Sequence, residues 1–179
     1  MHHDLAVGKD MKMLKAALAI AIGISAVSAT SYAVSAYNVN ATSCVADAAS
    51  IQNNLHIGTG GTIKFAAGKT GNIVLYCPVL SLGFTPRLLG FAYYDDTSTA
   101  GNHVTVQLIK MAADGSELTS FVTVDSDKAS VTKNGRPFHT ALSFTNQYDP
   151  INYAYYIRID IARNSPGANE TIYSVTLQN

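Results

Sequence analysis

Short runs in which apolar and polar residues alternate recur along this chain, and turn residues such as Gly, Asn, Asp and Pro separate them. The clearest run is Tyr155–Ile161, in which the isoleucines fall on one side and Arg158 and Asp160 on the other. Successive residues of a strand point to opposite faces of a sheet, so this pattern predicts strands with one buried and one solvated face. Such strands are typical of antiparallel sheets.

About eight runs of this kind predict about eight strands. They are Thr62–Phe65, Asn72–Cys77, Leu88–Tyr94, His103–Met111, Leu118–Val124, Phe138–Thr145, Tyr155–Ile161 and Tyr173–Leu177. No window of the sequence keeps an apolar period of 3.6 residues, as a long amphipathic helix would. The segment Cys44–Asn54 is the best candidate for one short helix. Many short strands without intervening helices predict an all-β fold. We expect a two-sheet antiparallel sandwich of jelly-roll or immunoglobulin-like topology.

Two of these runs also predict which side chains point toward the core. In the sixth run, Leu142 and Phe144 share one side with Phe138. In the last run, Tyr173 shares a side with Val175 and Leu177, while the residues between them face away. We therefore expect both sets of side chains to be buried.

The N-terminal segment has the order of features of a secretory signal peptide. A basic start at Met11–Lys15 precedes the apolar run Ala16–Val27, and small residues follow it, with cleavage expected after Ala33 or, alternatively, after Ala36. The apolar run is shorter than the roughly 20 residues of a membrane-spanning helix. The sequence therefore predicts a leader over residues 1–33, which is removed, and a single domain over residues 34–179 in a secreted or periplasmic location.

Charge and cysteine content narrow the partners and the compartment. Residues 34–179 hold nine Lys or Arg and ten Asp or Glu without a basic run, so no nucleic-acid or anionic-membrane partner is expected. The two cysteines, Cys44 and Cys77, are expected to form a disulfide, because cysteines of exported proteins usually pair. The alternative is a pair of buried free thiols.

The residues that could support catalysis lack the spacing that catalysis requires. His56, His103 and His139 lie far apart and form no metal-ligand pair, and no Gly-x-Ser-x-Gly nucleophile motif is present. The carboxylate clusters Asp95–Asp96 and Asp125–Asp127 fall at predicted strand ends, where Asp is a common turn residue. We therefore expect no enzyme activity and no cofactor, and calcium on these loop carboxylates is the alternative.

Tyrosine is the candidate contact residue, since residues 34–179 contain nine tyrosines and the chain has no tryptophan. Exposed tyrosines beside Asp or Asn can stack on sugar rings or anchor a protein partner, although tyrosines also fill cores and pair across strands. The expected contact set is Tyr93, Asp95, Asp96, Tyr156 and Arg158.

The leader, an early cysteine and the central Tyr76-Cys77-Pro78 together resemble small secreted bacterial single-domain proteins of unassigned function. This resemblance implies one disulfide and a sandwich fold, and it implies no active site. We expect an exported, non-catalytic β-sandwich that binds a carbohydrate or a protein at or outside the cell surface. A structural or self-assembling surface subunit is the alternative, and a secreted enzyme is the less favoured one.

Overall fold

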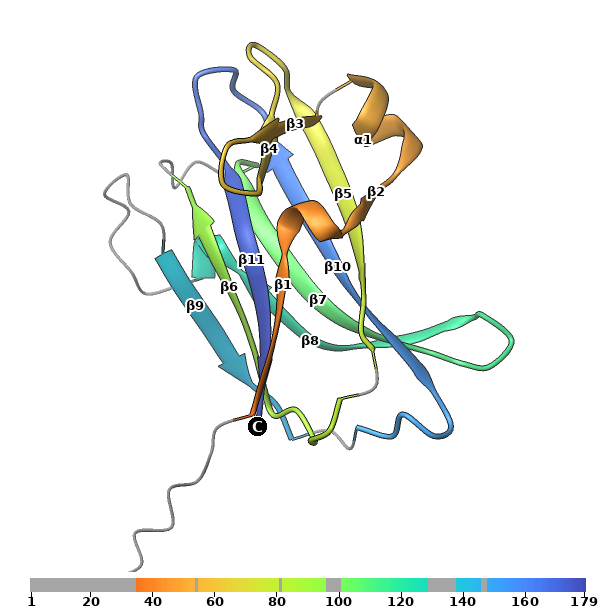
Figure 1. The fold of residues 1–179 in the computed structure, drawn as a ribbon. Helices are drawn as coiled ribbons and strands as arrows, with labels where there is room; N and C mark the ends of the chain where they lie inside the picture. Colours follow the sequence, from red (N-terminus) through yellow and green to blue (C-terminus); the bar gives the residue numbers. More distant parts are fainter. Residues whose placement is uncertain (1–34, 54, 81, 96–100, 129–137, 146–147) are drawn as a thin grey trace, which may run out of the picture. The chain divides into compact units, whose positions relative to one another are not determined.

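A computed structural model describes residues 35–179, apart from 54, 81, 96–100, 129–137 and 146–147. The chain divides into two compact units, residues 1–33 and residues 34–179, and the second unit is described below. Its described residues form two antiparallel sheets with eleven strands (Figure 1). The predicted all-β sandwich is therefore confirmed.

Sheet A has the strand order β3–β4–β11–β6–β9, and β1 also pairs with β11. Its strands are β1 (Ala36–Asn40), β3 (Leu55–Gly58), β4 (Thr62–Phe65), β6 (Leu88–Tyr94), β9 (Phe138–Ser143) and β11 (Thr171–Gln178). β4 pairs with the first two residues of β11 and β1 with its later residues, so both lie along the same edge of β11 (Figure 1).

Sheet B has the strand order β2–β5–β10–β7–β8. Its strands are β2 (Val45–Ala46), β5 (Gly71–Pro78), β7 (His103–Met111), β8 (Glu117–Asp125) and β10 (Ala154–Arg163). Two short 3₁₀ helices, η1 (Ala41–Ser43) and η2 (Ser126–Lys128), follow β1 and β8.

All eight predicted strands are present, as β4 to β11, within a few residues of their expected ends. The sequence missed β1, β2 and β3, because runs of two to five residues show too little alternation to be recognised. The helix α1 (Ala48–Asn53) lies inside the predicted helical segment. None of the helices in the described ranges is long and apolar enough to cross a membrane.

The core lies between the sheets, and β10 shows how the sequence builds it. Ile157, Ile159 and Ile161 are fully buried, and each pairs with fully buried residues of β5 and β7. The residues between them, Arg158 and Asp160, are half-buried on the outer face. The predicted alternation of β10 is confirmed, and packing of these aliphatic side chains is the main source of stability of the sandwich.

The edge strand β9 departs from the expected burial. Leu142 pairs with the fully buried Leu89 and so shares its face, yet Leu142 remains 47% exposed. β9 is the outermost strand of sheet A, so it has a neighbouring strand on one side only. Phe144, just beyond the strand, is buried as expected, whereas the side chain of Phe138 lies outside the described residues.

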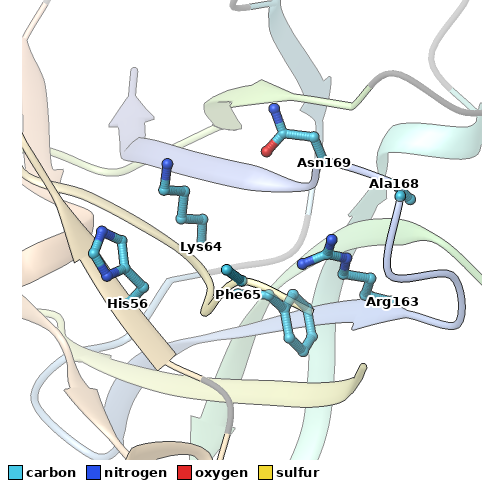
Figure 2. A pocket seen from close by; sticks show the side chains of 8 residues that line it. His56, Lys64, Phe65, Arg163, Ala168 and Asn169 are labelled. Carbon is cyan, nitrogen blue, oxygen red and sulfur yellow. The ribbon is translucent and has the colours of Figure 1, made fainter. Parts of the chain in front are cut away.

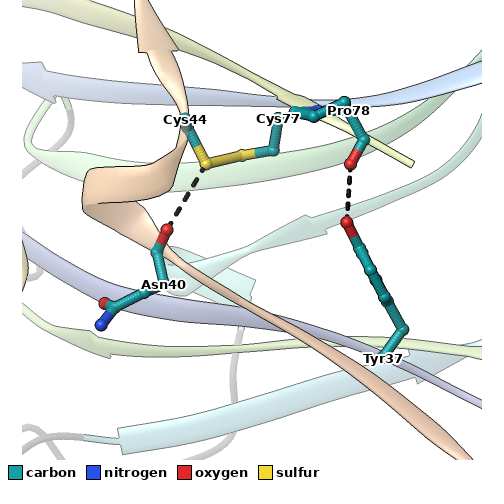
Figure 3. Close-up of a disulfide and its surroundings, with 5 residues drawn as sticks. All are labelled: Tyr37, Asn40, Cys44, Cys77 and Pro78. Atoms are coloured by element: carbon teal, nitrogen blue, oxygen red, sulfur yellow. Dashed lines mark hydrogen bonds between the residues drawn. A yellow bond between two sulfur atoms is a disulfide. The ribbon is translucent and has the colours of Figure 1, made fainter. Parts of the chain in front are cut away.

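A disulfide joins Cys44 and Cys77, with a Cα–Cα distance of 4.3 Å, and confirms the expected pairing. Cys44 directly precedes β2, on the segment that leaves sheet A for sheet B, and Cys77 is a buried residue of β5 (Figure 3). In β1, the Tyr37 hydroxyl donates to the Pro78 carbonyl at 2.9 Å. Both links hold the N-terminal segment against sheet B, and closing a loop of this length stabilises the fold by about 4 kcal/mol.

Candidate functional site

The structure does not bring the five residues of the expected contact set onto one surface. Tyr93 is 1% exposed and Asp95 is fully buried, where it accepts a hydrogen bond from the Ser126 hydroxyl at 2.8 Å. Tyr156 and Arg158 lie on the outer face of sheet B. Asp96 lies outside the described residues. Because Tyr93 and Asp95 are buried, Tyr156 and Arg158 are the two described members of the set that lie on a solvated face.

On the outer face of sheet B, the polar and aromatic side chains contact one another. The rings of Tyr76 and Tyr156 have centroids 5.9 Å apart, and Arg158 binds Asp160 at 2.9 Å within the same strand. The ring contact and the ion pair hold these side chains against one another over β5 and β10. These four side chains form a patch of aromatic and charged groups on the outer face of sheet B.

The carboxylates of Asp125 and Asp149 accept hydrogen bonds within the turns that contain them. Asp125 accepts a hydrogen bond from the backbone N–H of Asp127, as Asp residues commonly do in turns. The carboxyl of Asp149 accepts hydrogen bonds from the Asn152 side chain and from backbone N–H groups, which lower its pKa below the usual value. The described residues contain no group of three or more His, Cys, Asp or Glu side chains that could hold a metal ion.

On the outer face of sheet A, four strands align polar side chains in one row. Lys64 of β4 pairs with His56 of β3 and with Thr171 of β11, and Thr171 also pairs with Tyr94 of β6. Residues that pair in register share a face, so these four side chains lie together on the outer face of the sheet.

The residues beside this row anchor it. The neighbours in sequence of three row members are Ile63, Ile172 and Tyr93. Ile172 of β11 pairs with Ile63 of β4 and with Tyr93 of β6, and all three side chains are at most 2% exposed. Alternation therefore directs Tyr93 into the core and its neighbour Tyr94 to the outer face. A buried row on one face fixes the position of the polar row on the other.

Two adjoining hollows lie over this row and share Lys64 and Asn169. The first has a volume of about 370 Å³, and Figure 2 shows His56, Lys64, Arg163 and Asn169 around it with Phe65 beside the guanidinium. The second has a volume of about 320 Å³ and is lined by Gly58, Thr59, Thr62, Lys64, Tyr94, Asn169, Thr171 and Tyr173. We call the two hollows together the Lys64 groove.

Arg163 builds one wall of the groove. It is 8% exposed at the end of β10, and its guanidinium lies over the ring of Phe65, 5.6 Å from the centroid. The guanidinium also donates to the backbone carbonyls of Ser165 and Pro166. These contacts hold the loop between β10 and β11, which carries Asn169, in a fixed position beside the sheet.

A second buried residue fixes the start of the same loop. The side-chain oxygen of Asn102, which is 1% exposed, accepts hydrogen bonds from the backbone N–H groups of Asn164 and Ser165 at 2.6 and 3.3 Å. At the far end of the loop, the Thr171 hydroxyl donates to the Asn169 side-chain oxygen at 3.4 Å. The groove wall is therefore arranged before any ligand binds.

Tyr173 corrects one prediction from the sequence. Strict alternation placed it in the core with Val175 and Leu177, yet it is half-buried and lines the second hollow. The register between β11 and β6 shifts between Ile172 and Ser174, so Tyr173 is the extra residue of a β-bulge. A bulge inserts one residue into the alternation and redirects a side chain, which no period-two pattern can foresee.

The turn between β3 and β4 depends on glycine. Gly60 and Gly61 have φ angles of 82° and 79°, in the left-handed region that other residues rarely adopt. A Cβ atom on Gly61 would lie 2.6 Å from the side-chain nitrogen of Asn40. This turn brings His56 beside Lys64, and its residue Thr59 lines the second hollow.

The sequence analysis assigned neither Lys64 nor Asn169 to a binding site. Lys64 does alternate with Ile63 and Phe65 in a predicted strand, so its outward direction was readable. Tyr94 was visible as one of two consecutive tyrosines, and only the register shows that it is the outer one. The pairing of β4 with β11 joins residues more than 100 positions apart, and no local pattern signals it.

No protein-family model matches this chain, and no curated protein matches it either.

Several solved structures resemble the fold. A family two carbohydrate esterase from Cellvibrio japonicus has 14% identity and a TM-score of 0.42; the match covers 82% of this chain and 34% of the esterase, so this chain spans about a third of its length. The xylan-binding module CBM15 has 14% identity and a TM-score of 0.47, with 80% and 95% covered. The xylan-binding module CBM86 from Roseburia intestinalis has 11% identity and a TM-score of 0.43, with 80% and 94% covered. At these values the likenesses carry no argument about function.

Proposed function

We propose that residues 34–179 form an exported, non-catalytic carbohydrate-binding domain whose ligand lies in the Lys64 groove. The observation that carries this proposal is the lining of the second hollow. Two tyrosines, Tyr94 and Tyr173, border the same hollow as Lys64, Asn169 and Thr171. The combination of aromatic rings with amide, hydroxyl and ammonium groups matches the chemistry of a sugar.

A sugar ring has an apolar face of C–H groups and a rim of hydroxyl groups, and it needs both kinds of partner. Tyrosine offers a large apolar ring with a polar hydroxyl at its tip. Lys64 is a hydrogen-bond donor, and Asn169 and Thr171 can donate and accept; Lys64 and Thr171 pair on the same face of the sheet, and Asn169 lines the hollow from the adjoining loop. Binding sites generally combine apolar walls with a few such polar groups.

The fixed wall of the groove favours binding further. Arg163 and Asn102 hold the loop that carries Asn169, and paired strands hold Lys64, Thr171 and Tyr94. Groups that are ordered before binding lose less conformational entropy when the ligand arrives. A weakly held, hydrated ligand such as a sugar gains most from such an arrangement.

Export is supported by the disulfide. Disulfides form and persist in oxidising compartments, and Cys44 pairs with Cys77 here. We therefore propose that residues 1–33 act as a leader that is removed. Intact mass spectrometry of the protein from its natural host tests this, since a chain that retains residues 1–33 would contradict export by this route.

The binding role is tested with a glycan array, followed by calorimetric titration of the glycans that bind. We expect Tyr173→Ala and Tyr94→Ala to weaken binding about tenfold, as loss of a central aromatic contact commonly does. The matched control is Tyr76→Ala, which removes a 40% exposed tyrosine from the outer face of sheet B and should leave affinity unchanged.

Three outcomes would contradict the proposal. If Tyr76→Ala or Tyr156→Ala weakens binding while Tyr173→Ala does not, the ligand binds the outer face of sheet B. If no glycan binds and the protein forms large assemblies in size-exclusion chromatography, the self-assembling alternative gains support. If bound glycans are cleaved, the domain is an enzyme.

A further inference from the structure

The basic side chains that line the Lys64 groove are one Lys, one Arg and one His, and no Asp or Glu is among the described lining residues. They are His56, Lys64 and Arg163, and all three line the first hollow. The chain as a whole is balanced, with 12 Lys or Arg and 12 Asp or Glu. The basic character of the groove is therefore local, and general basicity of the protein does not explain it.

Lys64 occupies the central position in this arrangement. It pairs with His56 on one side and Thr171 on the other, and it borders both hollows. Its ammonium group therefore lies within reach of a ligand in either hollow. Lys64 is half-buried, and partial removal from water strengthens its interaction with an anion relative to a fully exposed lysine.

Arg163 adds a positive charge at a buried position, where contacts within the protein fix the guanidinium group. It is 8% exposed and is kept in place by the Ser165 and Pro166 carbonyls and by the ring of Phe65. The contacts described for Arg163 are with two backbone carbonyls and an aromatic ring, and its positive charge lies in the wall of the first hollow. The positive potential is thus built into the wall of the groove.

We infer that the groove selects acidic polysaccharides, with a hexuronate carboxylate in the first hollow and a neighbouring sugar ring against Tyr94 and Tyr173 in the second. This inference rests on the proposed carbohydrate-binding function and specifies its ligand class. A carboxylate accepts charge-assisted hydrogen bonds from an ammonium group such as that of Lys64, and these bonds are stronger than those between neutral groups. Two adjoining hollows suit at least two sugar units.

The test compares pairs of ligands that differ only in charge. Hexuronate oligosaccharides and their methyl esters are titrated calorimetrically against the folded domain at low ionic strength. We expect the acid forms to bind roughly tenfold more tightly than the esters, because a charge-assisted hydrogen bond is lost on esterification. The difference should shrink at high salt, which screens exposed charges.

Variants assign the effect to the groove. Lys64→Gln should remove most of the preference for the acid form, Lys64→Arg should restore it, and thermal unfolding confirms that both variants fold. Lys128→Gln is the matched control, since Lys128 is an exposed lysine of η2 and lines neither hollow. Tyr173→Ala should weaken the binding of acid and ester alike.

The outcomes separate this inference from the proposed function. If neutral glycans bind in the groove as tightly as hexuronates, or if Lys64→Gln keeps the preference, the inference is wrong and the carbohydrate-binding function stands. If no glycan of either kind binds, the proposed function fails and this inference fails with it.

Discussion

The outer faces of the two sheets are built by the same alternation, yet they differ in what their polar side chains contact. On sheet B, Arg158 binds Asp160, and Tyr76 packs against Tyr156 on the outer face. On sheet A, Lys64 and Tyr94 border hollows, and the loop between β10 and β11 forms one wall of these hollows. A solvated face of a sheet becomes a candidate binding site when a neighbouring loop lies beside it and the two together enclose a hollow.

The comparison also shows why exposed aromatic residues alone are weak guides to a site. Tyr76 is 40% exposed, packs against Tyr156 and lines neither of the two hollows of the Lys64 groove. Tyr173 is less exposed and borders a hollow, because the bulge in β11 and the loop before it surround it. Concavity thus separates the two faces more clearly than exposure does.

The largest expected effect separates the two consecutive tyrosines of β6. Tyr93→Ala should lower the free energy of unfolding by about 3–5 kcal/mol, because it leaves a cavity in place of a fully buried ring. Tyr94→Ala should cost about 1 kcal/mol in stability, since the side chain is half-buried on the outer face. Urea unfolding of both variants measures this difference. Equal losses would show that the two side chains are not on opposite faces.

An intermediate effect is expected for the wall of the groove. Arg163→Met should lower the free energy of unfolding by about 2 kcal/mol, because two backbone carbonyls lose a charged donor. The same variant should weaken glycan binding, since the loop that carries Asn169 loses its support. Arg87→Met, at an exposed position, is the control for both measurements. Unchanged binding by Arg163→Met would separate the loop from the site.

The smallest effect is expected on sheet B. Arg158→Gln removes a partly exposed ion pair with Asp160, and such pairs contribute about 0.5 kcal/mol. Thermal unfolding should therefore shift little, and glycan binding should not change. A loss of binding in this variant would reverse the comparison and move the site to sheet B.

The sequence predicts the layers of this fold better than its site. Alternation identifies the strands and the buried face of β10, because both depend on neighbouring residues. The site depends on register: only the pairing of Lys64 with Thr171 and of Thr171 with Tyr94 brings three distant segments together. The bulge at Tyr173 depends on the pairing of β11 with β6, and the hydrogen bonds from Asn164 and Ser165 to Asn102 join distant segments, so local patterns do not encode either feature.

The central position of β11 has a consequence for the order in which the domain matures. β11 is the last strand in the chain, and it pairs with β1, β4 and β6. A nascent chain that has not yet released Thr171–Gln178 leaves β4 without its inner neighbour and the groove without Thr171 and Tyr173. The groove is therefore complete only when Thr171–Gln178 has paired with β4 and β6 in sheet A.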